Sequence, residues 1–161
     1  MDATEVSDCF PLNGNVENPE IHTIDEVIRT YHKNTGNIKL LGPTRFAQVI
    51  SECKRIVEEH KNPKMFHILM ILTDGEIHDL KETIDQIADI SKRNLPMSIV
   101  IVGLGDEEFS NMVRLDGDEL AIRAGVKDIV QFLKMNEVIK RSQPEEVNAN
   151  LAALILEEIP G

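Results

Sequence analysis

The chain has 161 residues, and 17 basic against 28 acidic side chains give it a formal net charge of −11 at pH 7. Hydrophobic residues make up 42%, which suits one globular domain and not a disordered acidic tail. The negative charge argues against nucleic acid as a partner and against unaided docking on an anionic membrane, since both would repel the chain. The sequence holds no apolar run of bilayer-spanning length and does not begin like a secretory signal. We therefore predict a cytoplasmic chain with reduced cysteines.

The N-terminal part carries turn-forming residues followed by one amphipathic segment. Residues 1–20 are rich in Asn, Pro and Gly, so we expect an irregular segment there. Thr23 and Glu26 stand at capping-box spacing and predict a helix that ends near Asn34. A very short strand is expected over residues 38–41.

A second helix is predicted between Thr44 and His60. Thr44 can cap its first turn, and its apolar stripe recurs at steps of three and four, at Phe46, Ile50, Cys53 and Val57. Because Cys53 lies on this stripe, we interpret it as a packed thiol.

Two later runs, residues 65–72 and 97–102, are apolar apart from His67 and Ser98 and have the length of strands. Without alternation, such runs are typical of strands covered on both faces. The remaining pattern predicts helices over 79–93, 107–113 and 144–158, a loop over 115–125 and a third strand over 129–133. Strands that alternate with helices predict an α/β fold with a doubly wound, mainly parallel sheet flanked by helices.

Functional groups in such a sheet lie beyond the carboxyl ends of the strands, here at residues 42–44, 73–75 and 103–106. Asp74 follows a buried strand, where its carboxylate needs compensation by a divalent cation or by backbone amides of a turn. Thr44 allows the same two interpretations, as a helix cap or as a neutral oxygen ligand of a hard metal ion. The residues alone leave both alternatives open.

Several segments together resemble the A domain of copines, and they follow the same order along nearly the whole chain. They are residues 6–13 (VSDCFPLN), 38–44 (IKLLGPT), 67–79 (HILMILTDGEIHD), 95–118 (LPMSIVIVGLGDEEFSNMVRLDGD), 127–138 (KDIVQFLKMNEV) and 156–160 (LEEIP).

The resemblance implies a von Willebrand factor A-type domain over residues 1–161. Such domains bind Mg²⁺, Mn²⁺ or Ca²⁺ at a metal-ion-dependent adhesion site, whose ligands are an Asp-x-Ser-x-Ser loop, a Thr and an Asp. The Thr maps onto Thr44 and the Asp onto Asp74. Asp116 and Asp118 match a further motif of the family, for which we consider a surface turn or a secondary calcium-binding role.

The sequence departs from this family at one point, because it contains no Asp-x-Ser-x-Ser. We therefore expect a chain that begins after the family's first strand, with weakened metal binding. Without that strand, residues 65–72 would have an apolar, unpaired edge, through which the chain could self-associate.

The resemblance implies a protein-interaction module of a copine-like, calcium-dependent phospholipid-binding protein that recruits partner proteins in membrane-associated signalling or trafficking. Membrane contact would be indirect, through lipid-binding domains that this sequence does not contain. The alternative is an enzyme, a doubly wound hydrolase or nucleotide-binding protein that uses Asp74 and the Gly103–Gly105 loop. We favour the non-enzyme, because the sequence offers no nucleophile and base in a recognisable arrangement.

Overall fold

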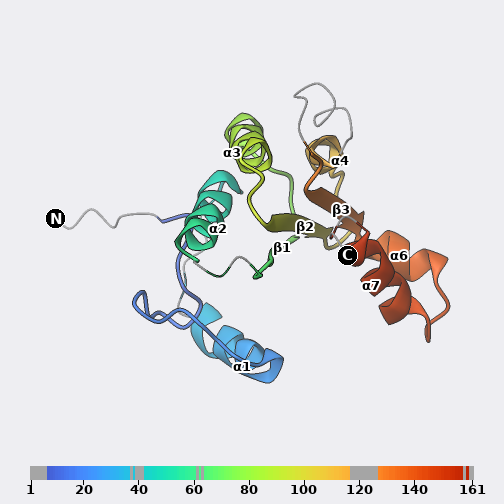
Figure 1. Cartoon of the computed structure of the whole chain (residues 1–161). Coiled ribbons are helices and arrows are strands. Elements are labelled where there is room, and N and C mark those ends of the chain that lie inside the picture. Colours follow the sequence, from blue (N-terminus) through green and yellow to red (C-terminus); the bar gives the residue numbers. More distant parts are fainter. Residues whose placement is uncertain are drawn as a thin grey trace. The chain divides into compact units, whose positions relative to one another are not determined.

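The computed structural model describes residues 7–36, 38, 42–60, 62, 64–116, 127–157 and 159 (Figure 1). The chain divides into two compact units, Met1–Pro43 and Thr44–Gly161. Most of the strand expected at 38–41, and residues 117–125 of the expected loop, lie outside the described residues.

The first unit contains the helix α1 (Ile24–Thr35). Thr23 caps it as predicted, because its Oγ1 accepts a hydrogen bond of 3.2 Å from the backbone N–H of Glu26. Near its other end, Asn34 Nδ2 donates to the carbonyl of Leu12 at 2.8 Å. This bond ties the turns before the helix to its last turn.

The second unit is built on a three-stranded parallel sheet of order β1-β2-β3, with β1 at His67–Thr73, β2 at Met97–Gly103 and β3 at Val130–Lys134. Among its described residues, the helices are α2 (Ala47–Glu59), α3 (Leu80–Lys92), α4 (Ser110–Leu115), α6 (Met135–Arg141) and α7 (Val147–Leu156). The predicted α/β fold with a parallel sheet flanked by helices is confirmed (Figure 1).

The sheet separates two apolar clusters, because successive side chains of a strand point to opposite faces. The larger cluster joins α2, α3 and α4 to one face and includes Ile50, Ile90, Ile99, Ile101, Phe109 and Met112. The smaller cluster joins α6 and α7 to the other face through Val100, Val102, Leu133 and Val138, with Leu151 and Ile155 against them. The central strand β2 is therefore buried along its whole length.

The prediction that β1 is covered on both faces was wrong. Leu69 and Ile71 pack against the larger cluster, but Ile68, Met70 and Leu72 are 48%, 49% and 62% exposed. The smaller cluster involves β2 and β3, so β1 has no cover on that face within the described part of the chain. An uninterrupted apolar run thus forms a strand with one buried and one exposed face.

The chain after β3 also differs from the prediction. Residues 135–141 form α6, which the sequence reading missed, and the last helix begins at Val147 instead of 144. The hydroxyl of Ser142, before this helix, accepts a hydrogen bond of 2.9 Å from Asn150 Nδ2. Residues 142–146 therefore join two short helices.

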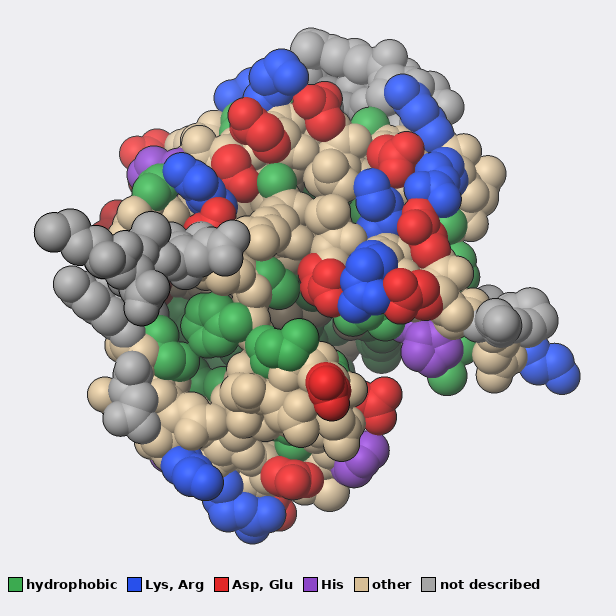
Figure 2. Space-filling model, turned by 90° about the vertical axis from the view of Figure 1, so that its left-hand side faces the viewer, with side chains coloured by type: hydrophobic (Ala, Val, Ile, Leu, Met, Phe, Trp, Pro, Cys, Tyr) green, Lys and Arg blue, Asp and Glu red, His purple; other side chains and the backbone are tan. Residues whose placement is uncertain are grey.

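Charged side chains of both signs lie next to one another over much of one face (Figure 2). On α2, Arg55 pairs with Glu52 and Glu59 at 2.6 Å each. Between α2 and α3, Glu58 pairs with Arg93. The excess negative charge of the chain is thus interspersed with positive charge on this face.

A pH dependence follows from the pair between Lys54 on α2 and Asp89 on α3, whose Nζ and Oδ2 lie 3.1 Å apart. The hydrogen bond from Lys54 holds the pKa of Asp89 below its ordinary value. The resulting stability is fully present above the unfolded carboxyl pKa of about 3.9 and is lost as the pH falls through the lower folded pKa.

We expect Asp89→Asn to make the free energy of unfolding depend slightly less on pH below neutral, because the titrating carboxyl is removed. The effect should be small, because Asp89 is half exposed and well screened. The measurement is the urea midpoint between neutral pH and about pH 2.5. Asp85→Asn, which removes an exposed pair with Lys81 inside α3, is the control. Equal curves for Asp89→Asn and the wild type would contradict the expectation.

Candidate metal site at the carboxyl end of the sheet

The loop after β1 carries the carboxylate singled out from the sequence. β1 ends at Thr73, which is buried, and Asp74 follows with an exposed side chain. The hydroxyl of Thr73 accepts a hydrogen bond from the N–H of Gly75 at 3.4 Å and donates to its carbonyl at 3.1 Å. Thr73 therefore shapes the turn and presents Asp74 to solvent, where water compensates its charge.

The loop that carries Thr44 lies directly against this turn. A Cβ on Gly75 would lie 3.8 Å from Thr44 Oγ1, so the Thr44 hydroxyl stands over the backbone of the residue after Asp74. The carbonyl of Thr44 accepts a hydrogen bond of 3.0 Å from the N–H of His78. The structure thus brings together the two loops that hold the predicted site residues, which are 30 positions apart in the sequence.

Asp79 joins the same two loops through the start of α2. Its carboxylate accepts hydrogen bonds from the N–H of Phe46 at 3.0 and 3.1 Å and from that of Ala47 at 2.9 Å. The first N–H groups of a helix have no acceptor within the helix, so the Asp79 carboxylate supplies one. A negative charge at this end also complements the helix dipole. The prediction that Thr44 caps this helix was wrong, because α2 begins at Ala47 and Asp79 supplies the cap from another loop.

Glu76, the third carboxylate of the loop, is also engaged. It accepts from the N–H of Asn111 in α4 at 3.2 and 3.4 Å. Asp79 and Glu76 thus hold the starts of α2 and α4, whereas Asp74 has no hydrogen-bond or ion-pair partner among the described residues. Of the three carboxylates, Asp74 is the one available to a ligand.

The donors at this position are a carboxylate and a neighbouring hydroxyl, both hard oxygen ligands of the kind that Mg²⁺, Mn²⁺ and Ca²⁺ prefer. Their chemistry fits such an ion, but six or more positions must be filled around it. The described residues contain no group of three or more His, Cys, Asp or Glu side chains that could hold a metal ion. Thr44 and Asp74 would therefore supply only part of the coordination shell.

The Gly103–Gly105 loop, which the alternative interpretation assigns to a nucleotide, follows β2. A Cβ on Gly103 would lie 2.9 Å from the ring of Phe109, which is completely buried. Gly103 thus leaves room for an aromatic ring of the core. The loop is further fixed by Asn136, whose Nδ2 donates to the carbonyl of Gly105 at 3.0 Å. These contacts give Gly103 a packing role and anchor the carbonyl of Gly105, and they do not favour a phosphate cradle.

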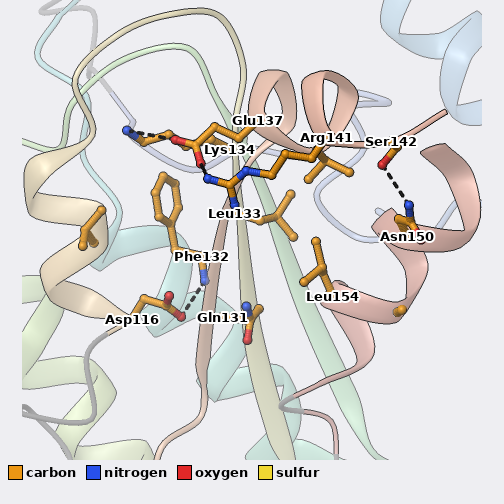
Figure 3. A pocket seen from close by; sticks show the side chains of 13 residues that line it. Asp116, Gln131, Phe132, Leu133, Lys134, Glu137, Arg141, Ser142, Asn150 and Leu154 are labelled. Atoms are coloured by element: carbon orange, nitrogen blue, oxygen red, sulfur yellow. Dashed lines mark hydrogen bonds and ion pairs between the residues drawn. The ribbon is translucent and has the colours of Figure 1, made fainter. Parts of the chain in front are cut away.

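A pocket of about 620 Å³ lies beside β3, and the sequence reading did not find it (Figure 3). Its floor includes Leu133 and Leu154, and Glu137 stands 3.0 Å from Arg141 and 3.8 Å from Lys134. The spacing of Glu137 and Arg141 was the available sequence signal, but α6, which carries both, was not predicted. Glu137 pairs with both cations and therefore neutralises part of their charge beside the pocket.

Asp116 also borders this pocket, and its carboxylate accepts a hydrogen bond of 2.7 Å from the N–H of Phe132 (Figure 3). This contact gives Asp116 a structural role at the edge of β3. Asp118, the other acidic residue of that motif, lies outside the described residues.

The parallel sheet, its helices and the loops at its carboxyl end are consistent with the von Willebrand factor A-like class. The Copine family model matches residues 1–161. The chain is 41% identical over 163 residues to Copine-A of Dictyostelium discoideum and 36% identical over 168 residues to nicotinic receptor-associated protein 1 of Caenorhabditis elegans. The chain therefore belongs to the copine family.

Each alignment covers 98% of this chain and 26% of the relative, so the chain spans about a quarter of the length of these relatives. Family membership supports a copine-like protein-interaction domain, and neither relative carries the name of an enzyme. Among the described residues, no helix is both long and apolar enough to cross a bilayer.

Proposed function

We propose that this chain is a protein-binding module in which Thr44 and Asp74 hold Mg²⁺, Mn²⁺ or Ca²⁺ weakly, so that a carboxylate of a partner protein can complete the coordination. The observation that carries the proposal is the pairing of the two loops. His78 and Asp79 bind the Thr44 loop, while the Asp74 carboxylate stays uncommitted among the described residues. A hard cation with open positions is suited to bind an acidic group of a partner.

The family supports the wider role. One relative is named for association with a nicotinic receptor, which is a statement about that protein. For this chain we propose recruitment of protein partners in membrane-associated signalling or trafficking, in the cytoplasm or peripherally at the membrane. Calcium-dependent phospholipid binding would belong to lipid-binding domains outside the 161 residues, since the chain spans 26% of its relatives. We propose no catalytic step, because the site offers oxygen ligands without a paired nucleophile and base.

The proposal predicts a metal-dependent stabilisation that requires Asp74. A ligand that binds the folded state selectively raises the melting temperature. At a free concentration tenfold above its Kd, it adds about 1.4 kcal/mol to the free energy of unfolding. We expect Mg²⁺, Mn²⁺ or Ca²⁺ to produce such a shift after chelator treatment, and Asp74→Ala to abolish it. Thr44→Ala should reduce it with little effect on metal-free stability, because Asp79 and not Thr44 caps α2.

The matched control is Asp85→Ala, which removes a carboxylate from the exposed surface of α3. It should keep the full metal response, because Asp85 is not one of the proposed ligands. A shift caused by general charge screening would instead persist in Asp74→Ala. A metal shift of equal size in Asp74→Ala and the wild type would overturn the site assignment. No shift in any variant would leave a metal-independent binding module and remove the cation from the proposal.

A further inference from the structure

The pocket of about 620 Å³ beside β3 is a groove with an apolar floor and a polar rim. Leu133 of β3 and Leu154 of α7 lie on the floor, and Leu154 is 37% exposed although it is apolar. Val113 of α4, which is 53% exposed, borders the same space. Apolar side chains that converge on a space of this size are typical of a binding site, because a ligand would remove them from water.

The outer edge of β3 offers little backbone pairing to a ligand in this groove. The N–H of Phe132 donates to Asp116 Oδ1 at 2.7 Å, and that of Val130 donates to Asp128 Oδ1 at 3.0 Å. Both N–H groups point away from β2, because the alternate residue Ile129 bonds to β2 through its carbonyl. Two carboxylates therefore occupy donors that an added strand would need. An occupant of the groove would accordingly be held by side chains.

The rim of the groove at α6 combines two cations with one carboxylate. Glu137 pairs through Oε2 with Arg141 Nη2 at 3.0 Å and through Oε1 with Lys134 Nζ at 3.8 Å (Figure 3). Among the described residues, neither cation has another ion-pair partner. A guanidinium has five N–H donors and an ammonium has three, so one carboxylate leaves most of these donors unused. The two cations can therefore bind a second carboxylate, supplied by a ligand.

Two side-chain amides line the remaining rim. Asn150 Nδ2 donates to the hydroxyl of Ser142 at 2.9 Å, whereas Gln131 has no hydrogen-bond partner among the described residues. Asp116, the other acidic residue of the lining, is engaged by the N–H of Phe132 and lies apart from Arg141 in Figure 3. A side-chain amide can donate to and accept from a peptide bond, whereas a hydrocarbon chain offers it nothing. These amides favour a peptide over a fatty acid as the occupant.

We propose that this groove binds a short segment of a partner protein in which acidic and apolar residues lie close together. Its carboxylates pair with Arg141 and Lys134, and its apolar side chains cover Leu133 and Leu154. This places a local attraction for acidic groups on a chain whose net charge is −11. The groove shares no residue with the proposed metal site, so the binding of this segment does not require a cation.

The test is an NMR titration of the isotope-labelled full chain with synthetic peptides, in the presence of a chelator. The probe is an acetylated and amidated octapeptide that contains leucine and glutamate in equal number, added to millimolar concentration. We expect saturable shifts of the amide signals of residues 131–134 and of α6 and α7. Matched octapeptides with lysine in place of glutamate, or with serine in place of leucine, should bind at least about tenfold more weakly.

Arg141→Gln tests the charged rim of the groove. It should weaken binding of the leucine–glutamate peptide about tenfold, because a charge-assisted hydrogen bond is lost. The side chain of Arg141 is 80% exposed, so the fold should tolerate this change. The matched control is Lys140→Gln, which removes the same charge from the neighbouring position of α6. Lys140 pairs with Asp106 and does not line the groove, so this variant should bind like the wild type.

Leu154→Gln tests the apolar floor. Glutamine is a helix former of similar strength, so α7 should persist, while the peptide should bind about fivefold more weakly because less apolar surface is covered. The matched control is Leu156→Gln, since Leu156 belongs to the same helix and is 57% exposed but does not line the groove. It should leave the affinity unchanged.

Three results would overturn the proposal. The first is the absence of peptide-dependent shifts at millimolar concentration. The second is equal weakening by Arg141→Gln and Lys140→Gln, which would reduce the interaction to general charge attraction. The third is tighter binding of decanoate than of the peptide, which would make the groove a site for a small amphipathic carboxylate. None of them would affect the metal proposal, whose readout is the metal-dependent melting temperature, because the peptide is measured in chelator.

Discussion

Replacing Phe109 with alanine should lower the free energy of unfolding by about 3–5 kcal/mol, the range for removing a fully buried aromatic side chain. Phe109 is completely buried. Its ring packs against Gly103, lies 5.6 Å from the ring of Phe132 and has Lys134 Nζ 5.9 Å from its centroid. It therefore links α4 to the ends of β2 and β3, and its loss should leave a cavity between them. Urea unfolding of the wild type and variant measures the difference.

Phe66→Ala is the control, because Phe66 is 39% exposed and should cost much less. Equal losses in the two variants would contradict the assignment of Phe109 to the core.

The contact between Phe109 and Gly103 can be tested from the other side. Gly103→Ala should cost about 1–3 kcal/mol, as overpacking does, because the added Cβ would lie 2.9 Å from the ring. In the Phe109→Ala background, the same substitution should cost less, since the space is then empty. If Gly103 served a phosphate instead, Gly103→Ala would leave stability unchanged and remove a nucleotide-dependent melting shift.

The parts of the fold that the sequence predicted well are those in which local pattern and tertiary packing agree. The stripe of α2 is one case, because Phe46, Ile50 and Val57 recur at helical spacing and are all buried. The buried strand β2 is another, since Ser98 is the one polar side chain of its run and both of its faces are covered. Periodicity alone is sufficient for such elements.

The sequence could not distinguish β1 from β2, although within the described residues β1 lies at the edge of the sheet and β2 at its centre. Both are mainly apolar runs without alternation, and their burial depends on how far α6 and α7 extend over the sheet. That coverage is a property of the whole unit. For the same reason the sequence could show Thr44 and Asp74 as candidates, and only the structure could bring their loops together.

Capping of α2 by Asp79 could not be recognised from the sequence for a related reason. The carboxylate stands 33 positions after Phe46, whereas capping motifs are recognised within three or four residues. Thr44 lies a few residues before α2, and the local sequence pattern therefore predicted that Thr44 caps this helix. The actual cap couples the start of α2 to the loop that follows β1.

Asp79→Ala should lower the free energy of unfolding by about 2 kcal/mol or more, because hydrogen bonds to a charged group at a helix start are among the stronger ones. The N–H groups of Phe46 and Ala47 would lose their acceptor, and Thr83, which is completely buried, would lose the carboxylate that its hydroxyl contacts at 3.3 Å. Asp79→Asn should lose less, since an amide oxygen can still accept one of these bonds. Chemical denaturation of the three proteins gives the order.

Asp79→Ala should also weaken any metal response without removing a ligand, because the Thr44 loop would be held by the His78 bond without the cap. This separates it from Asp74→Ala, which should abolish the metal response while metal-free stability stays near that of the wild type. The opposite pattern, with Asp74→Ala strongly destabilising and Asp79→Ala neutral, would mean that the cap lies elsewhere and that Asp74 is the structural carboxylate of the loop. The two aspartates stand five positions apart, and the contacts place Asp79 at the start of α2, whereas Asp74 has no partner among the described residues.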